Sequence, residues 1–268
     1  MDLSNVNHGY LSYSGMTTWN DCPYKFYLHY IAKQRVRSDN IYNHFGGVMH
    51  EIMEQLFDPN MKKTDFIKAA LPLWKEKYFE GWEDSFIDPK FYLKEEDKII
   101  FYEQGINTIK NKLTKIHAAL KRRYGDYTIV GKELSCETPI FNGTNITGNM
   151  DLVIDSPKKG AHIIIDYKAV KDFSKWRNVK PIKFHQANIY DELYRVQHGC
   201  EKVETAFLII SRAKDNEIIQ FVDNPLEKSA TYEWVDIVTF GIKNDVFFKN
   251  KGGSSCYMCQ YNRTEYCP

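Results

Sequence analysis

Residues 147–168 read TGNMDLVIDSPKKGAHIIIDYK, and this stretch has the pattern of two strands joined by a tight turn. The first strand is expected over 146–155. The second is expected over 161–167, where three consecutive isoleucines are β-branched, as in a buried strand. Residues 156–160, SPKKG, are rich in turn formers. The sequence therefore predicts a β-hairpin, around which the rest of the chain is organised.

Two acids and a lysine meet in this hairpin. Asp151 lies on the first strand, and the second strand ends in Asp166, Tyr167 and Lys168. Because strand side chains alternate, Asp166 and Lys168 share a face, where Asp151 of the neighbouring strand can reach them. Burying two carboxylates and an ammonium without a cation is costly, and hard oxygen ligands suit Mg²⁺ or Mn²⁺. Taken alone, the same pattern also fits a solvated strand end with a salt bridge.

The bulk composition is that of an ordinary globular protein. The chain has 268 residues, 43% of them hydrophobic, and a formal net charge of +1, which does not by itself indicate a nucleic-acid partner. The N-terminus lacks a basic region followed by an apolar run, and no apolar stretch is long enough to span a bilayer. We therefore expect a cytoplasmic protein with no membrane partner. In that reducing compartment its six cysteines are expected to be thiols or metal ligands.

Positive charge is concentrated just after the hairpin. From 168 to 183 the chain has six lysines or arginines against one acid, with Trp176 among them. Basic residues with an interleaved aromatic suit a phosphate backbone and a stacked base. Lys171, Lys175, Trp176 and Arg177 are therefore candidate DNA contacts, and a solvated loop is the other interpretation.

Helices and further strands are expected on both sides of the hairpin. Apolar spacing predicts helices over 45–57, 64–80, 94–124, 183–199 and 227–248. Strands are expected over 127–134, 136–141, 203–211 and 217–222. This order predicts an α/β protein with a mixed sheet flanked by helices. We expect one domain over 1–268, made of a helical region (1–125), a core (126–222) and a C-terminal helix and tail (223–268).

Cysteines mark both ends of the chain. Residues 22–27 read CPYKFY. Ser14 is expected to cap a helix before this segment, and Pro23 is expected to begin the next helix. A lone Cys22 is most simply a packed thiol. The tail, however, holds Cys256, Cys259 and Cys267, and three cysteines in a short polar segment are hard to explain by core packing. Four thiolates would suit Zn²⁺, although zinc ribbons usually show two C-x-x-C knuckles and this chain has one.

In this order the motifs resemble those of the RecB-type branch of the PD-(D/E)XK nuclease superfamily that carries an iron–sulfur cluster. The matching features are CPYKFY, the Gly-x-x-x-His spacing from Gly46 to His50, Asp151, the D-x-K of Asp166 and Lys168, a Gln-x-x-x-Tyr pair and the cysteine tail. The resemblance spans nearly the whole chain. The sequence is similar to CRISPR-associated RecB-like exonucleases and to free-standing phage homologues. This resemblance implies a restriction-endonuclease-like fold.

The resemblance also implies residue roles. Mg²⁺ or Mn²⁺ would be held by a nitrogen, two carboxylates and a carbonyl oxygen, from His50, Asp151, Asp166 and Tyr167. Lys168 would orient or activate the attacking water, and Gln186 and Tyr190 would order the metal site and help hold DNA. Glu133 would lie near the metals, with an exposed strand residue as the alternative. A [4Fe–4S] cluster would be bound by Cys22, Cys256, Cys259 and Cys267 and fasten the two ends of the chain together.

These roles imply a metal-dependent DNA exonuclease acting on single-stranded DNA or DNA ends in recombination, replication or CRISPR-type processing. Protein partners in a DNA-processing complex are a further expectation. The alternative is a DNA-binding or non-cutting subunit with a nuclease-like fold.

Overall fold

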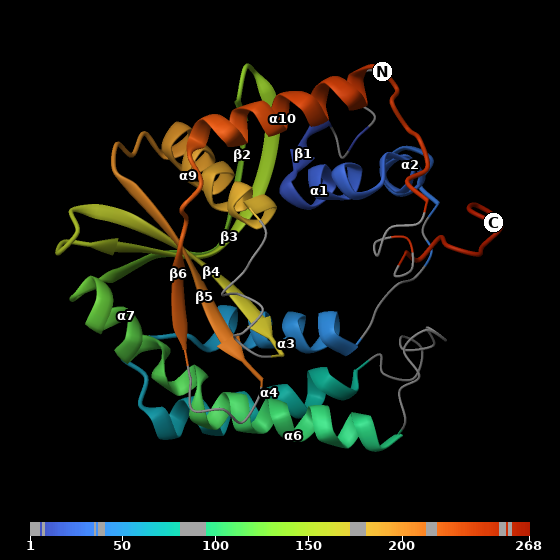
Figure 1. Cartoon of the computed structure of the whole chain (residues 1–268). Coiled ribbons are helices and arrows are strands. Elements are labelled where there is room, and N and C mark those ends of the chain that lie inside the picture. Colours follow the sequence, from blue (N-terminus) through green and yellow to red (C-terminus); the bar gives the residue numbers. More distant parts are fainter. Residues whose placement is uncertain are drawn as a thin grey trace.

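A computed structural model of the chain describes residues 6, 9–34, 36, 41–80, 95–171, 181–212, 219–251, 256 and 259–268. Its centre is a six-stranded mixed sheet with helices on both faces (Figure 1). The strand order is β1-β3-β4-β5-β6, and β2 pairs with β3 off this path. The expectation of a mixed sheet flanked by helices is therefore confirmed.

The strands differ widely in length. Their bounds are β1 Leu11–Ser12, β2 Thr128–Ile140, β3 Thr144–Ser156, β4 Ala161–Val170, β5 Val203–Ser211 and β6 Gln220–Asp223. The hairpin of β3 and β4 is antiparallel, and its ladder runs from Ser156↔Ala161 to Leu152↔Ile165. β4 and β5 are parallel, because α9 (His185–His198) crosses between them. This confirms the predicted central hairpin and extends its second strand by three residues.

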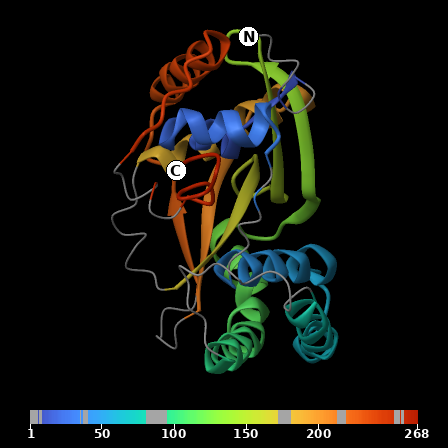
Figure 2. The same ribbon diagram turned by 90° about the vertical axis from the view of Figure 1, so that its right-hand side faces the viewer.

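One face of the sheet is covered by helices that precede the hairpin. These are α3 (Ile41–Leu56), α4 (Lys63–Phe79), α6 (Glu95–Asn111) and α7 (Ile116–Tyr124). Their apolar residues join alternate residues of β3, β4 and β5 in one buried cluster, which includes the fully buried Trp74. Figures 1 and 2 show α3, α4 and α6 together on this side.

The other face is covered by helices from both ends of the chain. They are α1 (Tyr13–Asp21), α9 and α10 (Lys228–Lys243), with α2 (Pro23–Phe26) beside α1 and a π-helical turn, Tyr27–Ile31, after it. Short 3₁₀ turns at Leu113–Lys115 and Pro181–Phe184 precede α7 and α9. Successive side chains of β3 and β4 point to opposite faces of the sheet, so they contribute to two separate hydrophobic cores, one on each face.

Three local expectations were wrong. The strands predicted over 127–134 and 136–141 form the single strand β2. The helix predicted over 94–124 is interrupted, because Lys112 leaves helical geometry and its buried ammonium donates a hydrogen bond to the Ser211 carbonyl. The cap of α1 is Ser12 rather than Ser14, since β1 ends at Ser12 and its Oγ accepts the Gly15 N–H at 3.1 Å.

The first helices lie beside the C-terminal segment. The Tyr24 N–H donates to the Phe248 carbonyl at 3.1 Å, and the Trp19 indole donates to the Val246 carbonyl at 3.1 Å. Figure 2 shows the C-terminal residues next to the helices of the N-terminal segment. Among the helices that the structure describes, none combines the length and apolarity needed to cross a bilayer.

Candidate active site

The site is built where the β3–β4 ladder opens. The last paired residues are Leu152 and Ile165, and the next ones along each strand are Asp151 and Asp166. Beyond this point the Tyr167 N–H has no ladder partner on β3. It donates instead to Oδ2 of Asp151 at 2.5 Å. The Asp151 carboxylate therefore satisfies the backbone donor that the diverging strands expose and is fixed in position by it.

Asp166 lies deeper in this opening. It is 5% exposed, and the Lys168 ammonium is 2.5 Å from its Oδ2. The Gln186 amide donates to Oδ1 at 2.9 Å and to the Tyr190 hydroxyl at 2.9 Å. Oδ2 of Asp166 is fully buried, and among the described residues the Lys168 ammonium is the only group that pairs with it. A cation would compensate such an oxygen.

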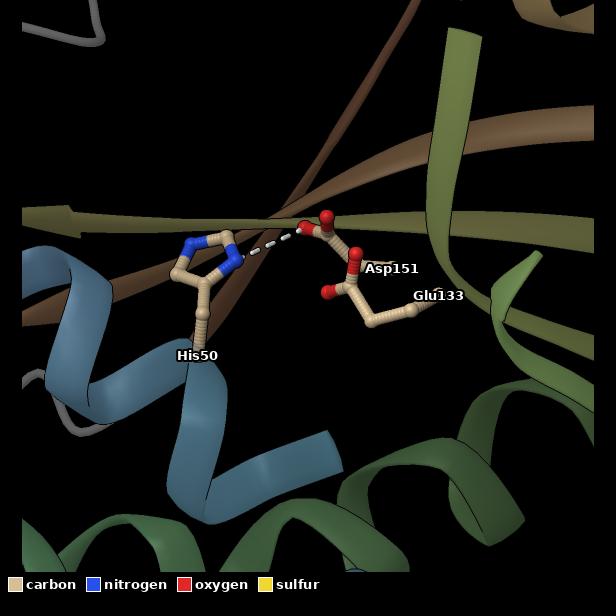
Figure 3. Close-up of side chains that lie close together, drawn as sticks. All are labelled: His50, Glu133 and Asp151. Atoms are coloured by element: carbon tan, nitrogen blue, oxygen red, sulfur yellow. Dashed lines mark ion pairs between the residues drawn. The ribbon is translucent and has the colours of Figure 1, made fainter. Parts of the chain in front are cut away.

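Three ligand-type side chains converge beside Asp166. Figure 3 shows His50 from α3, Glu133 from β2 and Asp151 from β3 pointing toward one another. One potential ligand atom from each lies within 4.8 Å of those of the other two, and Nδ1 of His50 is 3.5 Å from Oδ2 of Asp151. Among the residues that the structure describes, no other three His, Cys, Asp or Glu side chains bring their ligand atoms this close together. Two carboxylates and an imidazole suit Mn²⁺ or Mg²⁺.

Glu133, whose carboxylate lies beside His50 and Asp151, has a strained backbone. Its φ is +46°, a left-handed conformation that a residue with a Cβ rarely adopts. Glu133 falls between the pairs Lys132↔Leu152 and Leu134↔Met150, which places it opposite Asp151. The structure places the Glu133 carboxylate beside His50 and Asp151, and its position near a metal stays a prediction. Strain of this kind is often held at functional sites.

Replacing Glu133 separates its ligand role from its strain. Glu133→Gln and Glu133→Gly both remove the carboxylate, and we expect each to weaken Mn²⁺ binding about 10-fold or more. The glycine relieves the left-handed strain, so the Gly variant should be about 1 kcal/mol more stable than the Gln variant. Calorimetric Mn²⁺ titration and thermal unfolding measure the two effects. Unchanged Mn²⁺ affinity in both variants would exclude Glu133 as a ligand.

The acids of the site repel one another without a cation. Burial raises the pKa of Asp166, Lys168 opposes the shift, and the charge of Asp151 adds to it. Burial and the charge of Asp151 also raise the pKa of Glu133. Burial alone would lower the pKa of His50, but its hydrogen bond to Asp151 and the charges of Asp151 and Asp166 raise it overall. A divalent cation would remove the cost of keeping these carboxylates ionised, so the residues fit a metal.

The helix α9 is held unusually close to β3 behind the site. A Cβ added at Gly148 would lie 2.7 Å from the Tyr190 ring, a contact too short to be tolerated. Glycine at this position therefore lets Tyr190 approach the strand and hold the Gln186 amide against Asp166.

The predicted DNA-contact segment is only partly described. Lys171 is exposed just past the end of β4, whereas Lys175, Trp176 and Arg177 lie outside the described residues. The described part of the chain resumes at Pro181, and burial and the charge of Lys168 lower the pKa of Lys183. No sequence motif indicates a role for Arg212, a buried cation directly after β5.

The four predicted cluster cysteines line one cavity. Its volume is about 430 Å³ including open solvent, and all four side chains contribute to its wall, from Cys22, Cys256, Cys259 and Cys267. All are free thiols, and Cys259 is buried. The cavity lies between the first helices and the C-terminal segment. Four thiols facing one space fit an inorganic centre chemically. Cys136 and Cys200 are not among its lining residues.

The sequence and the fold were compared with known proteins. The family model of the PD-(D/E)XK nuclease superfamily matches residues 10–268. None of the curated proteins that were searched matches the chain.

Two solved structures align with most of this chain. The crystal structure of a candidate exonuclease from Eubacterium rectale is 15% identical, with a TM-score of 0.55. The match covers 97% of this chain and 90% of that one. The structure of SSO0001 is 12% identical over 93% of this chain and 95% of that one. Its TM-score of 0.34 is too low to support an argument. The first similarity shows a shared fold.

Proposed function

Because the chain belongs to the PD-(D/E)XK nuclease superfamily, we propose that it is a metal-dependent deoxyribonuclease of the RecB-type, iron–sulfur branch. The observation that carries this proposal is the opening of the β3–β4 ladder. There Asp151 and Asp166 follow the last ladder pair on neighbouring strands, the charge of Asp151 acts on Asp166, and Lys168 lies 2.5 Å from Asp166. That arrangement matches the chemistry of phosphodiester hydrolysis by a divalent metal.

Each side chain has a distinct task in this proposal. Asp151, Asp166 and His50 would hold Mg²⁺ or Mn²⁺ together with the Tyr167 carbonyl, and Glu133 would join them as a further ligand. A bound ion of this kind polarises the scissile phosphate and lowers the pKa of a bound water.

The remaining polar groups orient the reactants. Lys168 is half-buried, so its ammonium can reach both the Asp166 carboxylate and an incoming water. There it would orient the attacking water and offset the negative charge that develops on the phosphate. Gln186 and Tyr190 keep the Asp166 carboxylate in one orientation through their hydrogen bonds.

An iron–sulfur cluster is the second part of the proposal. The four cysteines of the cavity would bind it, with zinc as the alternative. The resemblance of the motifs to the iron–sulfur branch supports the cluster, and zinc ribbons usually show two C-x-x-C knuckles where this chain has one. We assign this centre a structural role, because its cysteine ligands would come from both ends of the chain and hold them together.

We further propose that the enzyme degrades DNA from an end. The support is the exonuclease assignment of the Eubacterium rectale relative and the resemblance of the motifs to end-trimming nucleases. The test uses linear and closed circular single-stranded DNA, linear duplex DNA and RNA of the same sequence, each with Mg²⁺ or Mn²⁺. We expect cutting of linear DNA and survival of the circle, with the labelled end giving the polarity. Cutting of the circle would make the enzyme an endonuclease, and binding without any cutting would favour a non-cutting subunit.

A further inference from the structure

Arg212 is a buried cation that no acidic side chain of the described residues pairs with. It follows β5 directly and is 6% exposed. Its backbone N–H donates to the carbonyl of Val170, the last residue of β4, at 2.8 Å. Within the described part of the chain, its guanidinium has neither a carboxylate nor a hydrogen-bond acceptor. Burial lowers the pKa of Arg212. An unneutralised buried charge is costly, so this position favours binding of an anion.

Three aromatic rings hold this guanidinium in place. It lies 5.0 Å from the ring centre of Tyr42, 5.2 Å from that of Phe45 and 4.8 Å from that of Phe101. These rings come from α3 and α6, and cation–π contacts of this kind orient the planar group without satisfying its donors. The guanidinium N–H donors of Arg212 therefore remain available to form two hydrogen bonds with one phosphate.

The aromatic cage and the metal site share one edge of α3. Tyr42, Gly46 and His50 are spaced four residues apart, so they lie along one stripe of the helix. The stripe is about 12 Å long from Tyr42 to His50 at 1.5 Å per residue. Along the sheet, Arg212 lies three residues beyond Ile209, the partner of Lys168, which is about 10 Å. Both measures correspond to about two phosphate-to-phosphate steps along a single strand, because each step is roughly twice the axial rise per nucleotide of a duplex.

Between these two points the helix surface is bare. A Cβ added at Gly46 or at Gly47 would meet nothing within 4 Å. Each glycine costs the helix about 1 kcal/mol relative to alanine, and no neighbouring side chain of the described protein fills the space it leaves. The two glycines therefore leave room for something outside the fold to approach the α3 backbone.

We propose that Arg212 binds a backbone phosphate of the nucleic-acid strand about two nucleotides from the scissile phosphate, and that the strand runs along α3 over Gly46 and Gly47. This inference rests on the proposed nuclease function and adds to it a fixed binding path. The path explains why a cation is buried at the end of β5 and why a half-exposed helix carries two adjacent glycines.

The test measures binding separately from cutting. Anisotropy of a labelled single-stranded DNA is recorded in EDTA over a range of salt concentrations. Loss of one phosphate contact lowers the slope of log K against log salt by about 0.7 and weakens binding roughly 10-fold or more. We expect both changes in Arg212→Gln. The matched control is Arg123→Gln, which also removes a cation that lies over aromatic rings, but one paired with Asp223 at the other end of the sheet.

A second variant covers the case in which Arg212→Gln does not fold. Gly46→Leu adds a side chain into open space on a helix, so thermal unfolding should occur at the same or a higher temperature. We expect its DNA affinity to fall. An unchanged salt slope in folded Arg212→Gln, or unchanged affinity in Gly46→Leu, would overturn the inference and leave the nuclease proposal standing. Absence of DNA binding by the unmodified protein, both in EDTA and with Ca²⁺ in place of EDTA, would overturn both.

Discussion

Lys168→Ala is expected to slow cleavage by a factor on the order of 10²–10³ or more while leaving DNA binding nearly intact. The ammonium lies 2.5 Å from Oδ2 of Asp166, at the point where the attacking water would be held. Its removal takes away the positive charge nearest the developing charge on the phosphate. It also leaves Asp166, a buried acid whose pKa burial already raises, without its ion-pair partner.

Single-turnover cleavage of labelled DNA measures this effect, with binding measured in EDTA. The matched control is Lys159→Ala, which removes a partly exposed lysine from the turn at the other end of the same hairpin, where it pairs with Glu204. That variant should cut at the rate of the unmodified protein. A Lys168→Ala variant that cuts equally fast would remove Lys168 from the chemistry.

Cys259→Ser is expected to release the bound centre and to destabilise the protein strongly. A link between Cys22 and Cys256 would close a loop of more than 200 residues. In the chain-entropy model, a cross-link over a loop of this length contributes about 5 kcal/mol. For a protein of this size, that loss lowers the unfolding temperature by roughly 10–20 °C.

Iron, zinc and acid-labile sulfide analysis, together with thermal unfolding, tests this prediction. Cys200→Ser is the control, because Cys200 does not line the cavity and its thiol donates only to the Lys202 carbonyl. Equal unfolding temperatures and metal contents for Cys259→Ser, Cys200→Ser and the unmodified protein would contradict a structural centre at the cysteines. Zinc without sulfide would identify the alternative metal.

Much of the fold follows from periodicity that is local in the sequence. The alternation around residues 146–167 predicts the hairpin and places Asp166 and Lys168 on one face, because a strand has a period of two. The spacing of Gln186 and Tyr190 places both on one side of α9, and their hydrogen bond is present at 2.9 Å. The α3 helix is predicted by the same kind of pattern.

Features that depend on distant contacts were not predictable in this way. Glu133 joins the site only because its backbone leaves regular strand geometry, which no residue pattern indicates. The break at Lys112 depends on the Ser211 carbonyl of a strand nearly one hundred residues later. The cage of Arg212 uses rings from two separate helices, so its position after β5 gives no local signal.

The most direct test of the central claim is the rate at which end-labelled single-stranded DNA is cut with Mn²⁺ by the unmodified protein and by Asp166→Asn. The substitution keeps the shape of a side chain that is 5% exposed and removes its charge. We expect Mn²⁺-dependent cutting by the unmodified protein, loss of cutting in EDTA, and none above background by the variant. Equal cutting by both proteins, or cutting that persists in EDTA, would contradict a metal-dependent nuclease centred on Asp151 and Asp166.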